Sequence, residues 1–177
     1  MEVSAPIFLA GVKLGAMTTG LAALRERLVS DLALRCLCGR SSPFYLRLYS
    51  EGLLNSTFGS GVDFAAGEGM MIFGGESKDP QAVTDALLAE AEAVAQKGFD
   101  PALFDRQKKA ACGGRLRALN DFRGLAVSIV EGCFAGFQPM DAFAMLEGIT
   151  VEDATAWVRE HLVRERVALS IIRPKEG

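Results

Sequence analysis

Residues 39–54 read Gly-Arg-Ser-Ser-Pro-Phe-Tyr-Leu-Arg-Leu-Tyr-Ser-Glu-Gly-Leu-Leu, and this stretch decides the order of the elements around it. Gly39 can end a preceding helix, because glycine reaches the left-handed conformation at no steric cost. Ser42 and Pro43 can begin the next helix, since a serine side chain caps free N–H groups and proline suits the first helical turn. Gly52 ends that helix after about two turns. The stretch therefore predicts a long helix, a sharp break and a short helix.

From Thr57 onward the apolar pattern changes to a period of two, as in a half-buried strand. One face would carry Phe58, Ser60, Val62 and Phe64, and the other Thr57, Gly59, Gly61 and Asp63. The sequence Gly67-Glu68-Gly69 supplies a turn, and residues 70–74 return as the partner strand. This segment is predicted to be a β-hairpin.

The remaining sequence predicts one strand near each end and helices between them. Residues 7–14 form a short apolar run bounded by Pro6 and Gly15, and residues 167–172 form a second such run. Helix starts lie at Thr18 or Thr19, Asp79-Pro80, Asp100-Pro101, after Asn120 and Asp121, between Pro139 and Gly148, and at the capping box Thr150–Asp153. We predict an α+β fold in which an antiparallel sheet of about four strands carries helices on one face. Residues 1–177 are expected to form a single domain.

Composition excludes several classes of protein. Half of the 177 residues are hydrophobic, and the formal net charge of −3 argues against nucleic-acid binding, which needs clustered Lys and Arg. No window approaches the ~18 apolar residues of a membrane span, and the N-terminal run does not resemble a signal peptide. Four cysteines without a secretion signal indicate reduced thiols and a cytoplasmic location. Cys36 and Cys38 lie two residues apart on a predicted helix, which favours core packing over a shared metal.

The residue types also argue against catalysis by this chain alone. His161 is the one histidine, whereas helical zinc-protease motifs need two imidazoles about a turn apart. We interpret His161 as a surface or capping residue near a helix C-terminus, where the dipole favours positive charge. A stand-alone hydrolase would have to use Cys112 with His161, or a pair of carboxylates, and it stays an alternative. The carboxylates near the short helix and hairpin are Glu51, Asp63, Glu68 and Glu76.

Six segments in a fixed order carry a family resemblance. They are Gly-Arg-Ser-Ser-Pro-Phe-Tyr-x-x-Leu-Tyr-x-Glu-Gly-Leu at 39–53, Gly-Gly-Glu-Ser-Lys-Asp-Pro at 74–80, Gly-Phe-Asp-x-x-x-Phe-Asp-Arg-x-Lys-Lys at 98–109, Leu-Arg-Ala-Leu-Asn at 116–120, Leu-Glu-Gly-Ile-Thr-Val-Glu-Asp at 146–153, and the strand at 167–174. Together they resemble the M16 zinc metallopeptidases (pitrilysin, insulinase and processing peptidases). No segment is a signature by itself; the ordered set is specific, and it covers essentially the whole chain.

The part resembled is the C-terminal, non-zinc domain of a family half. In the family, a similarly folded first domain bears the inverted His-x-x-Glu-His motif, which is absent here. The resemblance implies the fold of processing-peptidase-type metallohydrolases and no catalytic or metal-binding residue in this chain. It implies that a longer parent protein is a metalloendopeptidase that binds zinc. It also implies that this chain is inactive by itself. The implied partners are a zinc-bearing M16 domain in the same or another chain, an unfolded peptide enclosed between the two domains, and a possible dimer, but no nucleic acid or membrane. A non-catalytic structural or interaction subunit of an M16-like complex is the alternative.

Three residues are candidates for peptide contact by this resemblance. Larger family members contribute an arginine and a tyrosine to bound substrate, just after the short helix. Tyr49 and Ser56 occupy those positions here, so neither family role is carried over. Arg47 and Tyr49 remain nearby candidates, and a packing role for Tyr49 is equally open.

Overall fold

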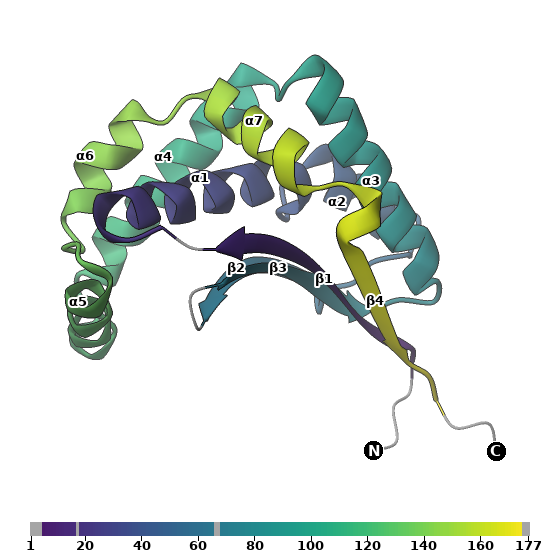
Figure 1. Cartoon of the computed structure of the whole chain (residues 1–177). Helices are drawn as coiled ribbons and strands as arrows, with labels where there is room; N and C mark the ends of the chain where they lie inside the picture. The colour runs from purple at the N-terminus through teal and green to yellow at the C-terminus, as the bar shows by residue number, and fades with distance from the viewer. Residues whose placement is uncertain (1–4, 17, 66–67, 175–177) are drawn as a thin grey trace.

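A computed structural model describes residues 5–16, 18–65 and 68–174 (Figure 1). The strands are β1 (Ile7–Ala16), β2 (Gly59–Ala65), β3 (Glu68–Glu76) and β4 (Val167–Ile172). The α-helices are α1 (Gly20–Cys38), α2 (Pro43–Ser50), α3 (Pro80–Lys97), α4 (Pro101–Ala118), α5 (Phe122–Ala135), α6 (Asp141–Gly148) and α7 (Val151–His161), and a 3-10 turn, η1 (Arg164–Arg166), precedes β4.

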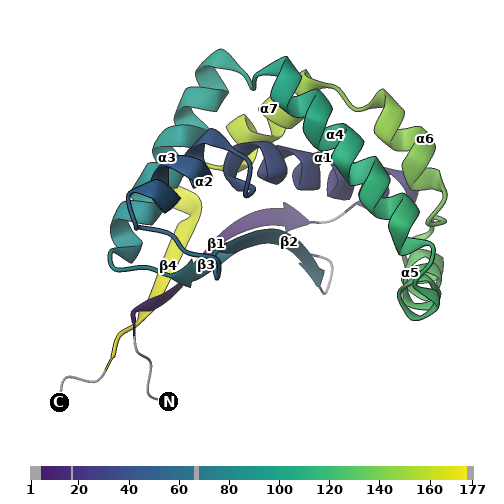
Figure 2. The same cartoon turned by 180° about the vertical axis from the view of Figure 1, so that it is seen from behind.

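The four strands form one antiparallel sheet in the order β2-β3-β1-β4. The helices lie on one face of this sheet, and the opposite face is bare in the described chain (Figures 1 and 2). In the register, Ala10 lies opposite Phe73 and Val12 opposite Met71, and all four side chains are buried. The predicted α+β class, with helices on one face of an antiparallel sheet, is confirmed.

The core lies between the sheet and the central helix α1. Leu24, Leu28 and Leu32 of α1 are almost fully buried, because leucines at four-residue steps share one helical face. Cys36 and Cys38 are also buried, and burial raises the pKa of Cys36 to about 12 and that of Cys38 to about 11. Their predicted role in core packing is confirmed.

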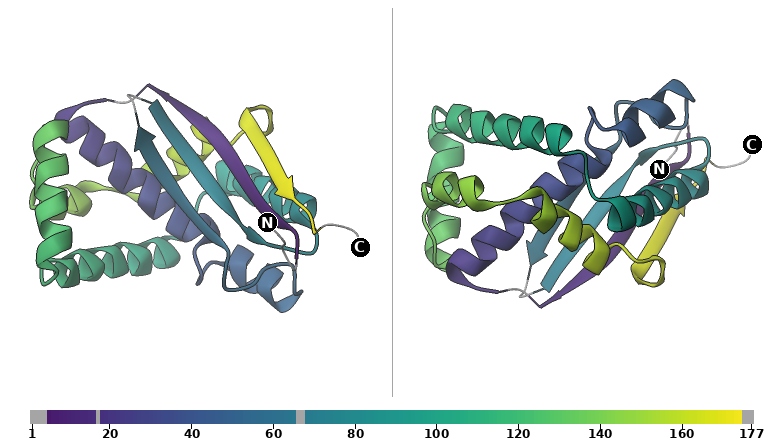
Figure 3. Two further views of the ribbon diagram at one scale, coloured as in Figure 1. Left: turned by 90° about the horizontal axis from the view of Figure 1, so that it is seen from below. Right: turned by 90° about the horizontal axis from the view of Figure 1, so that it is seen from above.

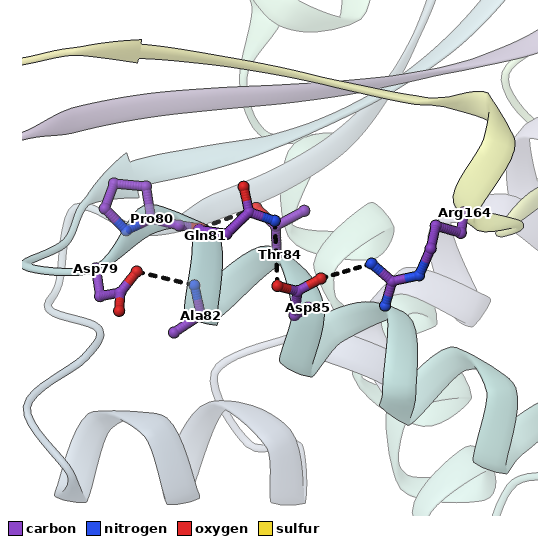
Figure 4. A network of polar contacts seen from close by, with 7 residues as sticks. All are labelled: Asp79, Pro80, Gln81, Ala82, Thr84, Asp85 and Arg164. Carbon is purple, nitrogen blue, oxygen red and sulfur yellow. Dashed lines mark hydrogen bonds and ion pairs between the residues drawn. The ribbon is translucent and has the colours of Figure 1, made fainter.

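Capping side chains start α2, α3, α4, α5 and α7 where the sequence predicts. Ser42 Oγ accepts a hydrogen bond from Tyr45 N at 3.1 Å. Asp79 and Asp100 cap α3 and α4, and Asp121 restarts the helix as α5. Thr150 and Asp153 form the full capping box of α7. Figure 4 shows the start of α3, where Asp79 Oδ1 accepts from Ala82 N.

An ion pair ties the turn before β4 to helix α3. Arg164 Nη1 lies 2.6 Å from Asp85 Oδ1, and Gln81 also donates to the Asp85 carboxylate at 3.1 Å (Figure 4). The hydrogen bond from Arg164 lowers the pKa of Asp85. Both partners are exposed, so this pair fixes geometry more than it contributes stability.

The prediction about Gly39 is correct in place but wrong in mechanism. Helix α1 ends there, yet Gly39 has φ −63°, outside the left-handed region. A Cβ at this position would lie 2.5 Å from the Arg35 carbonyl oxygen, so glycine is needed for close backbone approach. By contrast, Gly52 does adopt a positive φ of 69° after α2.

Three local predictions at the hairpin and at α1 also need correction or qualification. Strand β2 begins at Gly59 because Thr57 instead belongs to a turn, with its N–H donating to Asn55 Oδ1. Glu68 lies in β3, opposite Ala65, and Gly67 of the predicted turn is outside the described residues. Thr19 occupies the N-cap of α1, but its hydroxyl accepts no capping hydrogen bond from the first turn of the helix.

Candidate functional site

Strand β2 presents an open edge to solvent. Within the described residues it pairs with β3 alone, so its outer backbone N–H and C=O groups have no strand partner. Ser60 accepts a hydrogen bond from Cys38 Sγ at 3.2 Å, which ties one side of β2 to α1. Gly59 and Gly61 lie on the other side, and a Cβ at either position would meet no atom within 4 Å. We call residues 59–63 of this strand the β2 edge; its backbone can be approached closely.

The uncovered face of the sheet carries exposed apolar side chains among polar ones such as Lys13, Asp63 and Ser170, whereas an antiparallel sheet face in water is usually polar. Leu9 is 54% exposed, Met70 45% and Ile172 54%, although all three lie in the sheet. Gly11, Ile72 and Ala168 lie side by side across β1, β3 and β4 between them. We call this surface the bare sheet face. Strands that are apolar on both sides are typical of sheets covered on both faces, so a partner is expected here.

The three candidate contact residues each have a different partner in the described structure. Arg47 Nη2 lies 3.7 Å from Glu90 Oε2 of α3. Tyr49 is exposed, and its ring stacks on Tyr45 with centroids 5.7 Å apart. The carbonyl of Ser56, in the loop after α2, accepts a hydrogen bond from Arg40. None of these contacts joins Arg47, Tyr49 and Ser56 to one another, and the part of these residues in peptide binding stays a prediction.

The part of the chain that the structure describes has no site that fits a zinc ion. No group of three or more His, Cys, Asp or Glu in the described ranges is arranged to hold a metal. His161 ends α7 and packs against Trp157 with ring centroids 5.2 Å apart. Burial is the main cause that lowers the pKa of His161. Its Nδ1 atom is buried without a hydrogen-bond partner in the described structure.

The groups of the stand-alone hydrolase are also kept apart. Cys112 lies in the middle of α4 and lines a groove of about 660 Å³ between α4 and α6, whereas His161 lines a different cavity beside α1 and α7. Glu68 and Glu76 stand at opposite ends of β3, so their Cα atoms are roughly 25 Å apart. Glu68 pairs with Lys13 at 3.3 Å, and Glu76 accepts from Asn55 at 2.9 Å. Nothing in this arrangement supports shared acid–base chemistry.

Comparison with known proteins assigns the family. Residues 13–111 match the family described as the peptidase M16 inactive domain. The chain belongs to the M16 peptidase family, as its inactive domain. It is 30% identical over 182 residues to the uncharacterized zinc protease YmfH of Bacillus subtilis (strain 168), covering 99% of this chain and 41% of that protein.

Solved structures place the whole chain in the same fold. A candidate M16-like peptidase from Alicyclobacillus acidocaldarius superposes with a TM-score of 0.93 at 26% identity, over 99% of this chain and 42% of that one. The inactive peptidase domain of a candidate zinc protease from Bordetella parapertussis gives 0.81 at 17% identity, over 100% and 95%. The M16 inactive domain thus spans about two fifths of the first two relatives and nearly all of the third.

Sequence reasoning missed both surfaces of this M16 domain, although it predicted the strands that form them. One signal for the β2 edge was present: Gly59 and Gly61 alternate along one side of the strand. The edge position itself follows from the strand order, which local sequence does not encode.

No helix in the described part of the chain has the length and apolar character to cross a bilayer.

Proposed function

We propose that this M16 inactive domain binds extended peptide along the β2 edge and docks on a zinc-bearing M16 domain to enclose that peptide. The carrying observation is that one sheet offers an open strand edge beside an uncovered face with exposed apolar side chains. The zinc domain would supply the metal-activated water, since the residues described in this structure offer no ligand set for the metal. The role of this domain would be to hold and orient the peptide.

The β2 edge suits an unfolded peptide because backbone pairing is independent of side chains. An added strand gains its affinity from main-chain hydrogen bonds, and Gly59 and Gly61 place no side chain in its way. Asp63 adds a negative charge toward the end of the strand, opposite Met70. This recognition would be broad in sequence and weak, as a protease substrate wall requires.

The bare sheet face suits a protein partner better than a mobile peptide. Leu9, Met70 and Ile172 present apolar side chains that gain most from a packed, dry contact. The first two relatives are more than twice as long as this chain, one described as a zinc protease and the other as an M16-like peptidase, which supports a second domain as that partner. The four free cysteines, including exposed Cys133, support a reducing compartment such as the cytoplasm for the same protein.

Peptide titration tests the β2 edge. We expect saturable binding of a fluorescently labelled unfolded peptide, and roughly tenfold weaker binding by Gly61→Lys, because an edge lysine opposes strand addition. Gly148→Lys is the matched control, since a Cβ there also meets open space. The same peptide with every backbone nitrogen methylated should not bind, because it has no N–H group left to donate along an edge.

Two outcomes would contradict this part of the proposal. Equal binding of the methylated peptide would mean that the β2 edge is not used. A complete lack of saturable binding would favour the alternative function, a non-catalytic structural or interaction subunit.

Reconstitution tests docking. Adding this domain to a zinc-bearing M16 domain from the same source should raise its peptidase activity, and Leu9→Glu should remove most of that gain by placing a charge in the bare sheet face. Leu21→Glu changes an equally exposed leucine on α1 and should keep the gain. No gain over the zinc domain alone would argue strongly against docking. Turnover by this chain alone in EDTA would instead revive the stand-alone hydrolase.

A further inference from the structure

The two ends of the β2 edge carry opposite charges. Asp63 lies at one end of the edge, and its side chain is exposed. At the end where β2 begins, Arg40 is also exposed, and its Nη2 donates a hydrogen bond of 3.1 Å to the carbonyl oxygen of Ser56. Neither Asp63 nor Arg40 forms an ion pair with another described residue. Both charges are therefore available to a bound molecule.

Each end also holds a second carboxylate, and that carboxylate has a partner within the chain. Glu68, in the neighbouring strand β3, pairs with Lys13 at 3.3 Å. Glu76, at the far end of β3, accepts a hydrogen bond of 2.9 Å from Asn55. Asp63 has no such partner among the described residues, so it is the carboxylate that a ligand at this edge would neutralise.

The spacing of the two charges matches an extended peptide. Figure 3 shows β2 as the outermost strand of the sheet, on the side away from β4. Six residues separate Asp63 from Thr57 and seven separate it from Ser56, so the charges stand roughly 20 Å apart at about 3.3 Å per residue. Gly59 and Gly61 lie between them and add no side chain, so one peptide strand can reach both charges.

The pairing of the sheet favours one direction for an added strand. All strand pairs in the described residues are antiparallel, and antiparallel pairing is the more stable per residue. A peptide that continues this pattern runs from the Asp63 end of β2 toward the Arg40 end. Its residue opposite Asp63 therefore comes first, and the residues near Arg40 come six or seven positions later.

We propose that the β2 edge selects extended peptides by the order of their charges, with Asp63 as its main specificity-determining residue. The preferred peptide has a lysine or arginine opposite Asp63 and an acidic residue six or seven positions later, near Arg40. The reverse order would place like charges together at both ends, which is unfavourable. Because this selectivity belongs to the β2 edge, it rests on the proposed function and names the class of peptide that this edge binds.

Titration of the whole chain with two labelled peptides tests the charge order. Both peptides contain two lysines, five neutral residues and two glutamates, and the lysines come first in one peptide and last in the other. Composition and net charge are therefore equal. We expect the lysine-first peptide to bind about fivefold more tightly at low salt, because each exposed ion pair adds only a little. The difference should largely disappear in about 0.5 M NaCl, which screens exposed charges.

Charge-reversal variants assign the selectivity to Asp63 and Arg40. Asp63→Lys should abolish the preference, because both ends of the edge then carry positive charge. The double variant Asp63→Lys/Arg40→Glu exchanges the two charges and should prefer the glutamate-first peptide by about the same factor. Asp105→Lys makes the same charge change at an exposed position of α4 and should keep the wild-type preference.

The outcomes separate this selectivity from the proposed function. Thermal unfolding shows whether each variant keeps its fold, and Asp63→Asn, which keeps the shape of the side chain, should also reduce the preference. Equal binding of both peptides by the wild-type chain, with Gly61→Lys still weakening each, would overturn the charge order and leave edge binding standing. Tighter binding of the glutamate-first peptide would also overturn it, because the peptide would then run parallel to β2. If neither peptide binds saturably, edge binding fails and the selectivity fails with it.

Discussion

Phe44→Ala is expected to lower the free energy of unfolding by about 3–5 kcal/mol. Phe44 is the second residue of α2, fully buried, with its ring packed against Phe58 at 6.2 Å between centroids. Removing the ring leaves a cavity where α2 and the segment leading into β2 meet the core. For a domain of this size the loss corresponds to a fall in Tm of roughly 10–15 °C.

The same helix provides the control for this prediction. Leu46 is 57% exposed two residues later, so Leu46→Ala should change the free energy of unfolding by less than about 0.5 kcal/mol. Urea unfolding followed by circular dichroism measures both variants. A loss of less than about 1 kcal/mol for Phe44→Ala would mean that α2 is not anchored through this ring.

The start of each helix with a capping side chain was predictable because its chemistry is local. Ser42, Asp79 and Asp100 each accept from backbone N–H groups two or three residues ahead, so the pattern is complete within four residues of sequence. Gly39 shows the limit of that reasoning. Its conformation does not require glycine, and the contact that does, with the Arg35 carbonyl, appears only once the turn is built.

The exposed surfaces of α5 and β2 were less predictable than the helix and strand themselves. Exposure depends on which residues the rest of the chain leaves uncovered. Sequence reasoning predicted that a helix resumes through residues 125–134, and α5 is there. An apolar pattern cannot indicate whether its partner lies in the same chain, so the exposure of Phe134 was not foreseen. The β2 edge is similar: the strand is encoded in its alternation, but its outermost place arises from the pairing of β3 with β1. Arg47, Tyr49 and Ser56 came from a resemblance, and the structure leaves that prediction untested.

Gly74→Ala is expected to be the most damaging change of a single methyl group, costing about 3 kcal/mol of unfolding free energy. Gly74 pairs with Leu9 in the centre of the sheet. A Cβ there would overlap the Phe8 carbonyl oxygen and lie 3.0 Å from Leu9 Cα, and both are backbone atoms that cannot rotate away. Strands β1 and β3 would have to separate where they support both the core and the bare sheet face.

Gly61→Ala is the matched control, because it adds the same methyl group to the neighbouring strand β2. A Cβ at Gly61 meets nothing within 4 Å and Gly61 has no positive φ, so the variant should keep its stability or gain up to about 1 kcal/mol. Thermal and urea unfolding of the pair separate a steric requirement at Gly74 from a general preference for glycine in these strands. If Gly74→Ala were as stable as Gly61→Ala, the register between β1 and β3 described here would be wrong. The bare sheet face built on that register, and the docking proposed for it, would then lose their basis.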